Sequence, residues 1–168
     1  MPTSISLLGS FRRHYSEVLL AARDFQNAGL EIRSPSLSAV VNPGAEFIRF
    51  ASDAFDDTDQ KIQLQTLQKI LSSDIVYVVA PNGYVGRTTC YEIGRVHERC
   101  IPIFYSEPPK DLPILIRPGS VLSSQALTRA VVKSSGPLLE SDADIPSEIL
   151  DLERSLKKSG CPNRDPRN

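Results

Sequence analysis

The sequence has no tryptophan, one methionine and few cysteines and histidines, and neither sign of charge is in excess. The three cysteines (Cys90, Cys100, Cys161) lack metal-ligand spacing, and His14 and His97 are far apart in the chain, which argues against a zinc site and a disulfide framework. Nineteen basic and twenty acidic residues leave a formal net charge of −1, without the basic stripe that nucleic-acid binding requires. No apolar run approaches the ~20 residues of a membrane span, and the N-terminus lacks a signal-peptide pattern. We therefore expect a cytoplasmic protein with no membrane or nucleic-acid partner and no metal.

The length of 168 residues, 40% of them hydrophobic, suits one domain whose hydrophobic core can fold without a disulfide or a metal. We expect this domain to occupy residues 1–133. An extension with a helix at 147–158, opened by Pro146, would follow over 134–158, and residues 159–168 have the composition of a disordered tail.

Apolar runs alternate with segments of helical periodicity along most of the chain. The predicted strands are 4–9, 30–34, 74–80 and 101–105, with one more at 114–116, and the predicted helices are 15–28, 58–73, 88–99 and 124–133. Residues 35–57 read as a long loop with one helical turn. The alternation predicts a three-layer α/β/α sandwich with a mainly parallel, Rossmann-like (flavodoxin-like) sheet, whose ligands bind beyond the carboxyl ends of the strands.

Two loops at that edge lead into helices. The first, Gly9 to Arg13, offers backbone N–H groups, a hydroxyl and two guanidinium groups, which are the parts of an anion site. The other interpretation is a tight turn with solvated arginines. The second loop, Asn82 to Thr88, precedes Cys90 and Glu92, and Thr88 or Thr89 is the expected helix cap. Gly94 would let a backbone or a ligand approach.

Glu92 is the main candidate for chemistry, because a carboxylate on a helix that packs against the sheet is costly unless it is partnered or used. It could instead be exposed, or pair within its helix with Arg95 and Arg99. Cys90 fits a small buried residue better than a nucleophile, since no histidine stands near it in the sequence.

Taken together, Leu8-Gly9-Ser10-Phe11-Arg12, the Ser-Ser-Asp74 helix end before an apolar strand, the glycine-rich loop and Tyr91-Glu92-Ile93-Gly94 resemble the nucleoside 2-deoxyribosyltransferase family. The branch of deoxynucleoside 5′-monophosphate N-glycosidases is the most similar, over roughly residues 5–105. The resemblance implies a nucleoside or nucleoside 5′-monophosphate substrate, no cofactor, and a homodimer or higher homo-oligomer.

The same resemblance assigns roles to individual residues. Glu92 matches the nucleophile that attacks the anomeric carbon as the base leaves. Gly9, Ser10 and Arg12, with the intervening Phe11, match the loop that holds the sugar and phosphate. The segment with Asn82, Gly83 and Gly86 matches the loop that closes over them, and Arg87 is added as a phosphate contact from its charge alone.

Two departures weaken the match. The family has an aspartate on the helix before the central strand, where this chain has Thr66, with Gln63 one turn earlier as a neutral partner for Glu92. A base-contacting tyrosine of some members falls near Ser6. Aspartates 53, 56, 57 and 59 could supply a carboxylate if the long loop folds over the pocket, or act as helix-cap and solvated charges. A non-catalytic nucleotide-binding or sensing module, or an interaction domain that uses the C-terminal part, therefore stays open beside the enzyme.

Overall fold

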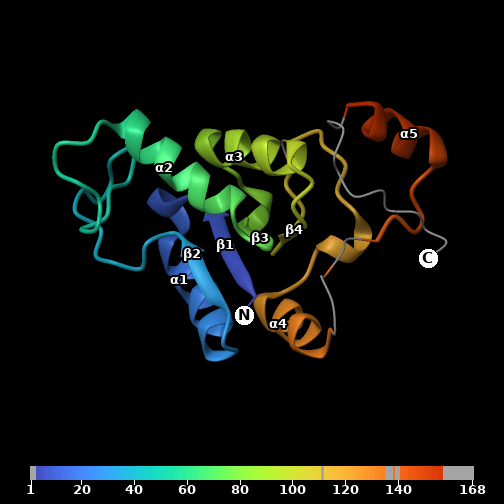
Figure 1. Ribbon diagram of the computed structural model, residues 1–168, viewed down its shortest axis with the longest axis horizontal. Helices are drawn as coiled ribbons and strands as arrows, with labels where there is room; N and C mark the ends of the chain where they lie inside the picture. The colour runs from blue at the N-terminus through green and yellow to red at the C-terminus, as the bar shows by residue number, and fades with distance from the viewer. Residues whose placement is uncertain (1–2, 111, 135–137, 139–140, 157–168) are drawn as a thin grey trace.

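Four parallel strands form the centre of the protein, in the order β2-β1-β3-β4 (Figure 1). The computed structural model describes residues 3–110, 112–134, 138 and 141–156. The strands are β1 (Ser4–Gly9), β2 (Glu31–Ser34), β3 (Ile75–Val79) and β4 (Ile103–Tyr105). This is the order of a flavodoxin-like sheet up to its fourth strand. Val121 pairs in parallel with Tyr105 as an isolated bridge, so the chain continues the sheet for one residue beyond β4.

Helices cover both faces of the sheet, which confirms the predicted three-layer sandwich (Figure 1). Helices α1 (Phe11–Asn27) and α4 (Ser124–Lys133) pack on one face, and α2 (Asp59–Leu71) and α3 (Arg87–Glu98) on the other. Helix α5 (Ser147–Leu156) and the 3-10 turns η1 (Pro81–Gly83) and η2 (Pro118–Ser120) complete the elements. The predicted tail at 159–168 lies outside the described residues.

The core strands are buried on both faces, as their apolar runs predict. All five residues of β3 are buried, and Tyr77 packs edge-on against Phe25 of α1 with ring centroids 5.2 Å apart. The serines of β1 are buried with partners: Ser6 shares a 2.7 Å hydrogen bond with Ser73, and Asp74 accepts hydrogen bonds from the backbone N–H and hydroxyl of Ser4. These bonds hold the amino-terminal edge of the sheet, away from the carboxyl ends of the strands.

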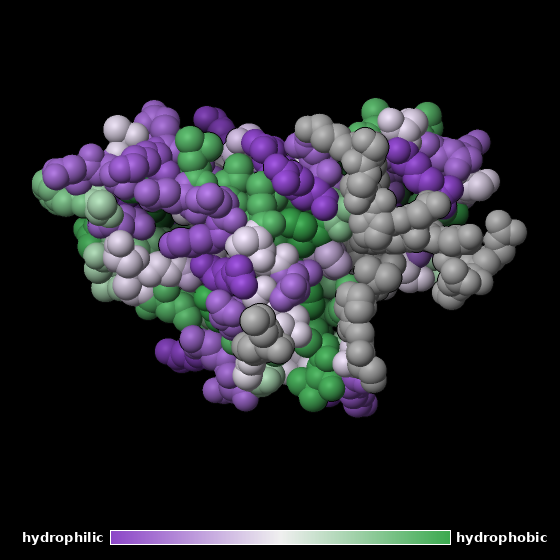
Figure 2. Space-filling view, in the orientation of Figure 1, coloured by the Kyte–Doolittle hydropathy of each residue, from purple (hydrophilic) through white to green (hydrophobic). Residues whose placement is uncertain are grey.

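The outer face of the α2/α3 layer is largely hydrophilic, with a band of hydrophobic side chains between the two helices (Figure 2). The buried residues of α2 are Ile62, Leu67 and Ile70. Leu64 lies on the solvent side of this helix and is 62% exposed.

Several local predictions are wrong. Residues 114–116 form no strand; Ile114 packs partly buried against the α2/α3 side of the core as irregular chain. Helix α3 is capped by Gly86 rather than by a threonine. A Cβ on Gly94 would meet nothing within 4 Å, so no backbone approaches it, whereas the approach of a ligand stays a prediction. Cys100 is disulfide-bonded, which departs from the expectation of a chain without a disulfide framework.

The C-terminal extension is attached to the domain through one buried cation. Arg117, 3% exposed, donates from Nε to Asp142 and from Nη2 to Glu153 of α5, each at 2.6 Å. A buried guanidinium needs such partners, since an unpaired charge would be costly there.

Among the described residues, no helix is long and apolar enough to cross a membrane.

Candidate functional site

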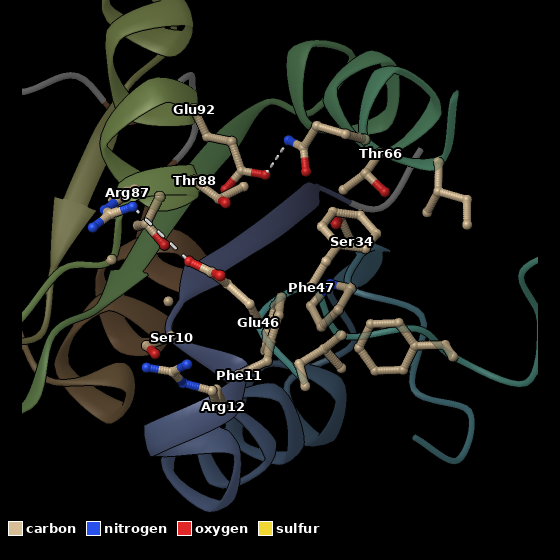
Figure 3. A pocket seen from close by; sticks show the side chains of 18 of the residues that line it. Ser10, Phe11, Arg12, Ser34, Glu46, Phe47, Thr66, Arg87, Thr88 and Glu92 are labelled. Atoms are coloured by element: carbon tan, nitrogen blue, oxygen red, sulfur yellow. Dashed lines mark hydrogen bonds and ion pairs between the residues drawn. The ribbon is translucent and has the colours of Figure 1, made fainter. Parts of the chain in front are cut away.

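A pocket of about 330 Å³ opens beyond the carboxyl ends of β1 and β2, between the first turn of α1, helix α2 and the start of α3 (Figure 3). The loop between β2 and α2 (residues 35–57, the β2–α2 loop) forms the remaining wall. Here the strand order reverses between β2-β1 and β1-β3, which is where sheets of this type bind ligands. The lining residues are Gly9, Ser10, Phe11, Arg12, Arg13, Ser34, Pro35, Ser36, Glu46, Phe47, Ile48, Phe50, Asp53, Ile62, Gln63, Thr66, Lys69, Tyr84, Gly86, Arg87, Thr88, Thr89 and Glu92.

Glu92 is the buried carboxylate of this pocket. It lies on α3, is 7% exposed, and its Oε1 accepts a 2.8 Å hydrogen bond from Nε2 of Gln63 on α2. Burial raises the pKa of Glu92 to about 7, and the Gln63 hydrogen bond opposes that rise. The dashed line that starts at Glu92 in Figure 3 marks this hydrogen bond. The group therefore changes charge near neutral pH.

The local sequence of α3 explains why Glu92 points inward. Thr89, one turn earlier, is also buried and lines the pocket, so both residues share the helix face that meets the sheet. The alternative of an exposed Glu92 is wrong, and Arg95 pairs with Glu98 at 3.4 Å rather than with Glu92. Glu92 thus meets a neutral amide and the pocket.

The turn after β1 is shaped by close packing. A Cβ on Gly9 would lie 2.9 Å from the Val79 carbonyl oxygen and 3.2 Å from Val18, so the position requires glycine. Ser10 caps α1 in an extended conformation without a side-chain hydrogen bond to the helix. In Figure 3 its hydroxyl and the Arg12 guanidinium lie at the pocket. Arg13 stacks on the Tyr84 ring, 4.3 Å from its centroid.

The structure brings together most of the residues predicted for catalysis and substrate binding. Of that set, all line the pocket except Asn82 and Gly83. Asn82 is exposed in η1 with φ 57°, and Gly83 is buried with φ 74°, where a Cβ would lie 2.7 Å from the Pro108 carbonyl oxygen. The Pro81–Gly83 turn thus packs against the chain after β4 rather than facing the pocket.

The positions at which the chain departs from the resembled family lie in different surroundings. Thr66 does line the pocket, but Gln63, one turn earlier, contacts Glu92. Ser6 is fully buried beside Ser73, away from the pocket. Of the aspartates, only Asp53 lines the cavity, and its Oδ2 accepts a hydrogen bond from the backbone N–H of Phe50.

The β2–α2 loop supplies a wall that the sequence did not predict in detail. It has no helical turn; an antiparallel bridge joins Val40 and Phe50. Phe50 packs against Phe11 at 5.8 Å and 80° between the rings, and Glu46 and Phe47 reach the cavity. The only available signal was the loop's length and its scattered aromatic residues.

Other reactive groups are less suited to chemistry. Burial raises the pKa of the Cys90 thiol, and this partly exposed residue does not line the pocket. Among the residues described by the structure, no group of three or more histidines, cysteines or acidic side chains is placed to hold a metal ion.

Comparisons with known proteins assign no family to the chain. No model of a known protein family matches it, and no curated protein matches it. Among solved structures, a crystal structure of a conserved protein from Enterococcus faecalis V583 is similar, with 14% identity and a TM-score of 0.48, covering 92% of this chain and 99% of that one. Functional inference therefore depends on the pocket itself.

Proposed function

We propose that the protein cleaves the N-glycosidic bond of a nucleoside or nucleoside 5′-monophosphate, with Glu92 as nucleophile. The observation that carries the proposal is the buried Glu92 carboxylate, hydrogen-bonded by Gln63 inside a pocket that also holds arginines and aromatic rings. The resemblance to nucleoside 2-deoxyribosyltransferases supports the same chemistry.

In the proposed reaction, one oxygen of the Glu92 carboxylate forms a bond to the anomeric carbon. The bond from that carbon to the base nitrogen breaks, and its electron pair leaves with the base, which takes up a proton. Water then attacks the glycosyl ester and restores the carboxylate, as in a retaining glycosidase. Attack by a second free base in place of water would give base exchange.

The remaining residues bind and orient. Gln63 donates to Oε1 of Glu92 and so holds the carboxylate in one orientation. Ser10 and Arg12 offer a hydroxyl and a guanidinium at the start of α1, which suits a 5′-phosphate. The rings of Phe11 and Phe47 give apolar surface for a planar base.

The pKa of Glu92 determines the expected pH dependence of the reaction. A nucleophile must be ionised, so kcat/KM should rise with pH through about 7. If Glu92 instead donated a proton to the departing base, the same limb would fall with pH. The direction of the profile therefore separates the two roles.

The test is to incubate the protein with ribo- and deoxyribonucleosides and their 5′-monophosphates, with and without a second base, and to separate the products by chromatography. We expect base release that Glu92→Gln abolishes. Glu31→Gln is the matched control, because Glu31 is an exposed glutamate of β2 outside the pocket lining. Equal release by wild type and Glu92→Gln would refute the nucleophile.

A second candidate is a non-catalytic nucleotide-binding or sensing module. It is favoured by the neutral Gln63 partner of Glu92 and by Thr66, which stands where the resembled family has a carboxylate. This module would bind nucleotide without turnover and would tolerate Glu92→Gln, which thermal shift with each nucleotide would reveal. The expected homo-oligomer stays a prediction that light scattering can check.

A further inference from the structure

Glu46 introduces a negative charge among the cations of the pocket. Its Oε1 lies 4.0 Å from Nη1 of Arg87, and both residues line the cavity. Figure 3 shows the Glu46 side chain reaching toward Arg87, with Ser10, Phe11 and Arg12 beside it in the same view. An anionic substrate bound at these arginines would therefore meet a carboxylate of the protein itself.

Glu46 is carried on an ordered part of the β2–α2 loop. The Asn42 side chain accepts from the Arg49 backbone N–H at 2.6 Å and donates to the Phe47 carbonyl at 2.8 Å, which closes the turn that bears Glu46. The base of this turn is attached to α2, because Arg49 pairs with Asp59 at 2.6 Å. The position of Glu46 thus follows from a bonded turn.

The Glu46–Arg87 pair itself is easily exchanged. The two side chains are 85% and 98% exposed, and exposed ion pairs contribute little to stability. A dianionic phosphate interacts more strongly with a guanidinium than a single carboxylate does, and it can bind in bidentate fashion. A phosphate could therefore take Arg87 from Glu46, whereas an uncharged ligand could not.

From these contacts we propose that Glu46 is a specificity residue that acts as a charge gate: it holds Arg87 in the free protein and gives it up to the phosphate of a substrate. This inference rests on the proposed function, because it specifies how that pocket selects its substrate. By repulsion, Glu46 lowers the affinity of the pocket for every anion. Only an anion with enough charge to displace Glu46 from Arg87 keeps appreciable affinity. Neutral nucleosides neither displace Glu46 nor meet its repulsion.

Removing the negative charge of Glu46 should change the affinity for phosphate in a defined way. Glu46→Gln should bind inorganic phosphate about fivefold more tightly at low ionic strength, because a neighbouring negative charge is lost. The gain should fade in ~1 M salt, where charges separated by more than about 3 Å are screened. Arg87→Gln should weaken phosphate binding, and Glu46→Gln should gain less when Arg87 is already absent.

The experiment is calorimetric titration of the full chain with inorganic phosphate, and with AMP and adenosine as a pair that differs only in the phosphate. The variants are Glu46→Gln, Arg87→Gln and the double variant, which together form a double-mutant cycle. Asp56→Asn is the matched control: it removes the same charge from the same loop, at an exposed residue outside the pocket lining.

The gate is supported if Glu46→Gln gains phosphate affinity, Asp56→Asn does not, and the gain shrinks without Arg87. It is overturned if Glu46→Gln binds phosphate like wild type, if Asp56→Asn gains equally, if the gain persists in full without Arg87, or if no variant binds phosphate. Base release is measured in parallel. Phosphate gating without release would refute the proposed reaction alone, and release with unchanged Glu46→Gln binding would refute the gate alone.

Discussion

Replacing Glu92 by glutamine should stabilise the protein above neutral pH while removing the proposed activity. Burial raises the pKa of Glu92 from 4.5 to about 7, so the folded state keeps a proton that the unfolded chain has lost between these values. Wild-type stability therefore falls as pH rises through this window, by roughly 1.4 kcal/mol per pH unit. The full cost of ionising the buried carboxylate is about 3 kcal/mol.

Glutamine avoids this cost and keeps a contact. Its amide oxygen can still accept the hydrogen bond that Gln63 donates to Oε1 of Glu92, and it carries no charge to desolvate. Below about pH 4 both proteins hold a neutral group at this position, and their unfolding free energies should agree. At pH 8 the variant should be more stable by about 3 kcal/mol, equivalent to roughly 6 to 12 °C in Tm.

The assay is urea unfolding of wild type and Glu92→Gln at a series of pH values from 4 to 9. The difference between the two curves isolates Glu92, because every other titrating group is common to both proteins. For example, the lowered pKa of Asp74, caused by its hydrogen bonds from Ser4, makes stability rise with pH, the opposite of Glu92. It does so equally in both proteins and cancels in the difference. A difference that stays flat across the pH range would refute a buried, proton-holding Glu92.

Three further substitutions probe the packing of the core and the electrostatics of the site. Gly9→Ala should cost about 1 to 3 kcal/mol in chemical unfolding, because its Cβ would lie 2.9 Å from the Val79 carbonyl oxygen; an unchanged midpoint would contradict that close approach. Tyr77→Phe should lower the unfolding free energy by about 1 kcal/mol, since its hydroxyl donates a 3.0 Å hydrogen bond to a backbone carbonyl, and an equal Tm would argue against that bond. Gln63→Glu should raise the pH at which the Glu92 site titrates, measured by the same urea series, because two adjacent carboxylates resist ionising together; a lower midpoint would contradict their contact.

The sequence was sufficient for the sheet and for the edge of it at which the pocket opens. The β3 residues form one apolar run, Gly9 ends the first strand, and Glu92 lies within a segment of helical periodicity, so their places follow from the alternation of strands and helices. Helix α4 begins and ends where its pattern predicts, at Ser124 and Lys133. Regular elements are predictable because burial repeats along them with a fixed period.

The pocket wall made by the β2–α2 loop was not predictable in the same way. Glu46 and Phe47 belong to no periodic pattern, and their positions depend on the Asn42 side chain and on the distant Asp59. The interpretation of Asn82 failed for a related reason. Its turn packs against the chain after β4, a contact between segments far apart in sequence that no local pattern encodes.

The neutral Gln63 partner of Glu92 also has a consequence for how the site can work. With one buried acid rather than two, Glu92 is raised to a pKa of about 7 by burial alone, and only a hydrogen bond from an amide opposes it. A second carboxylate would repel the first, whereas the amide can donate to the ionised form and so favours the charge that a nucleophile needs. The neutral partner thus serves either catalysis or binding. Catalysis differs from binding in that a proton must reach the departing base. Glu46 and Asp53 are the other carboxyl groups that line the pocket and are the candidates to supply it.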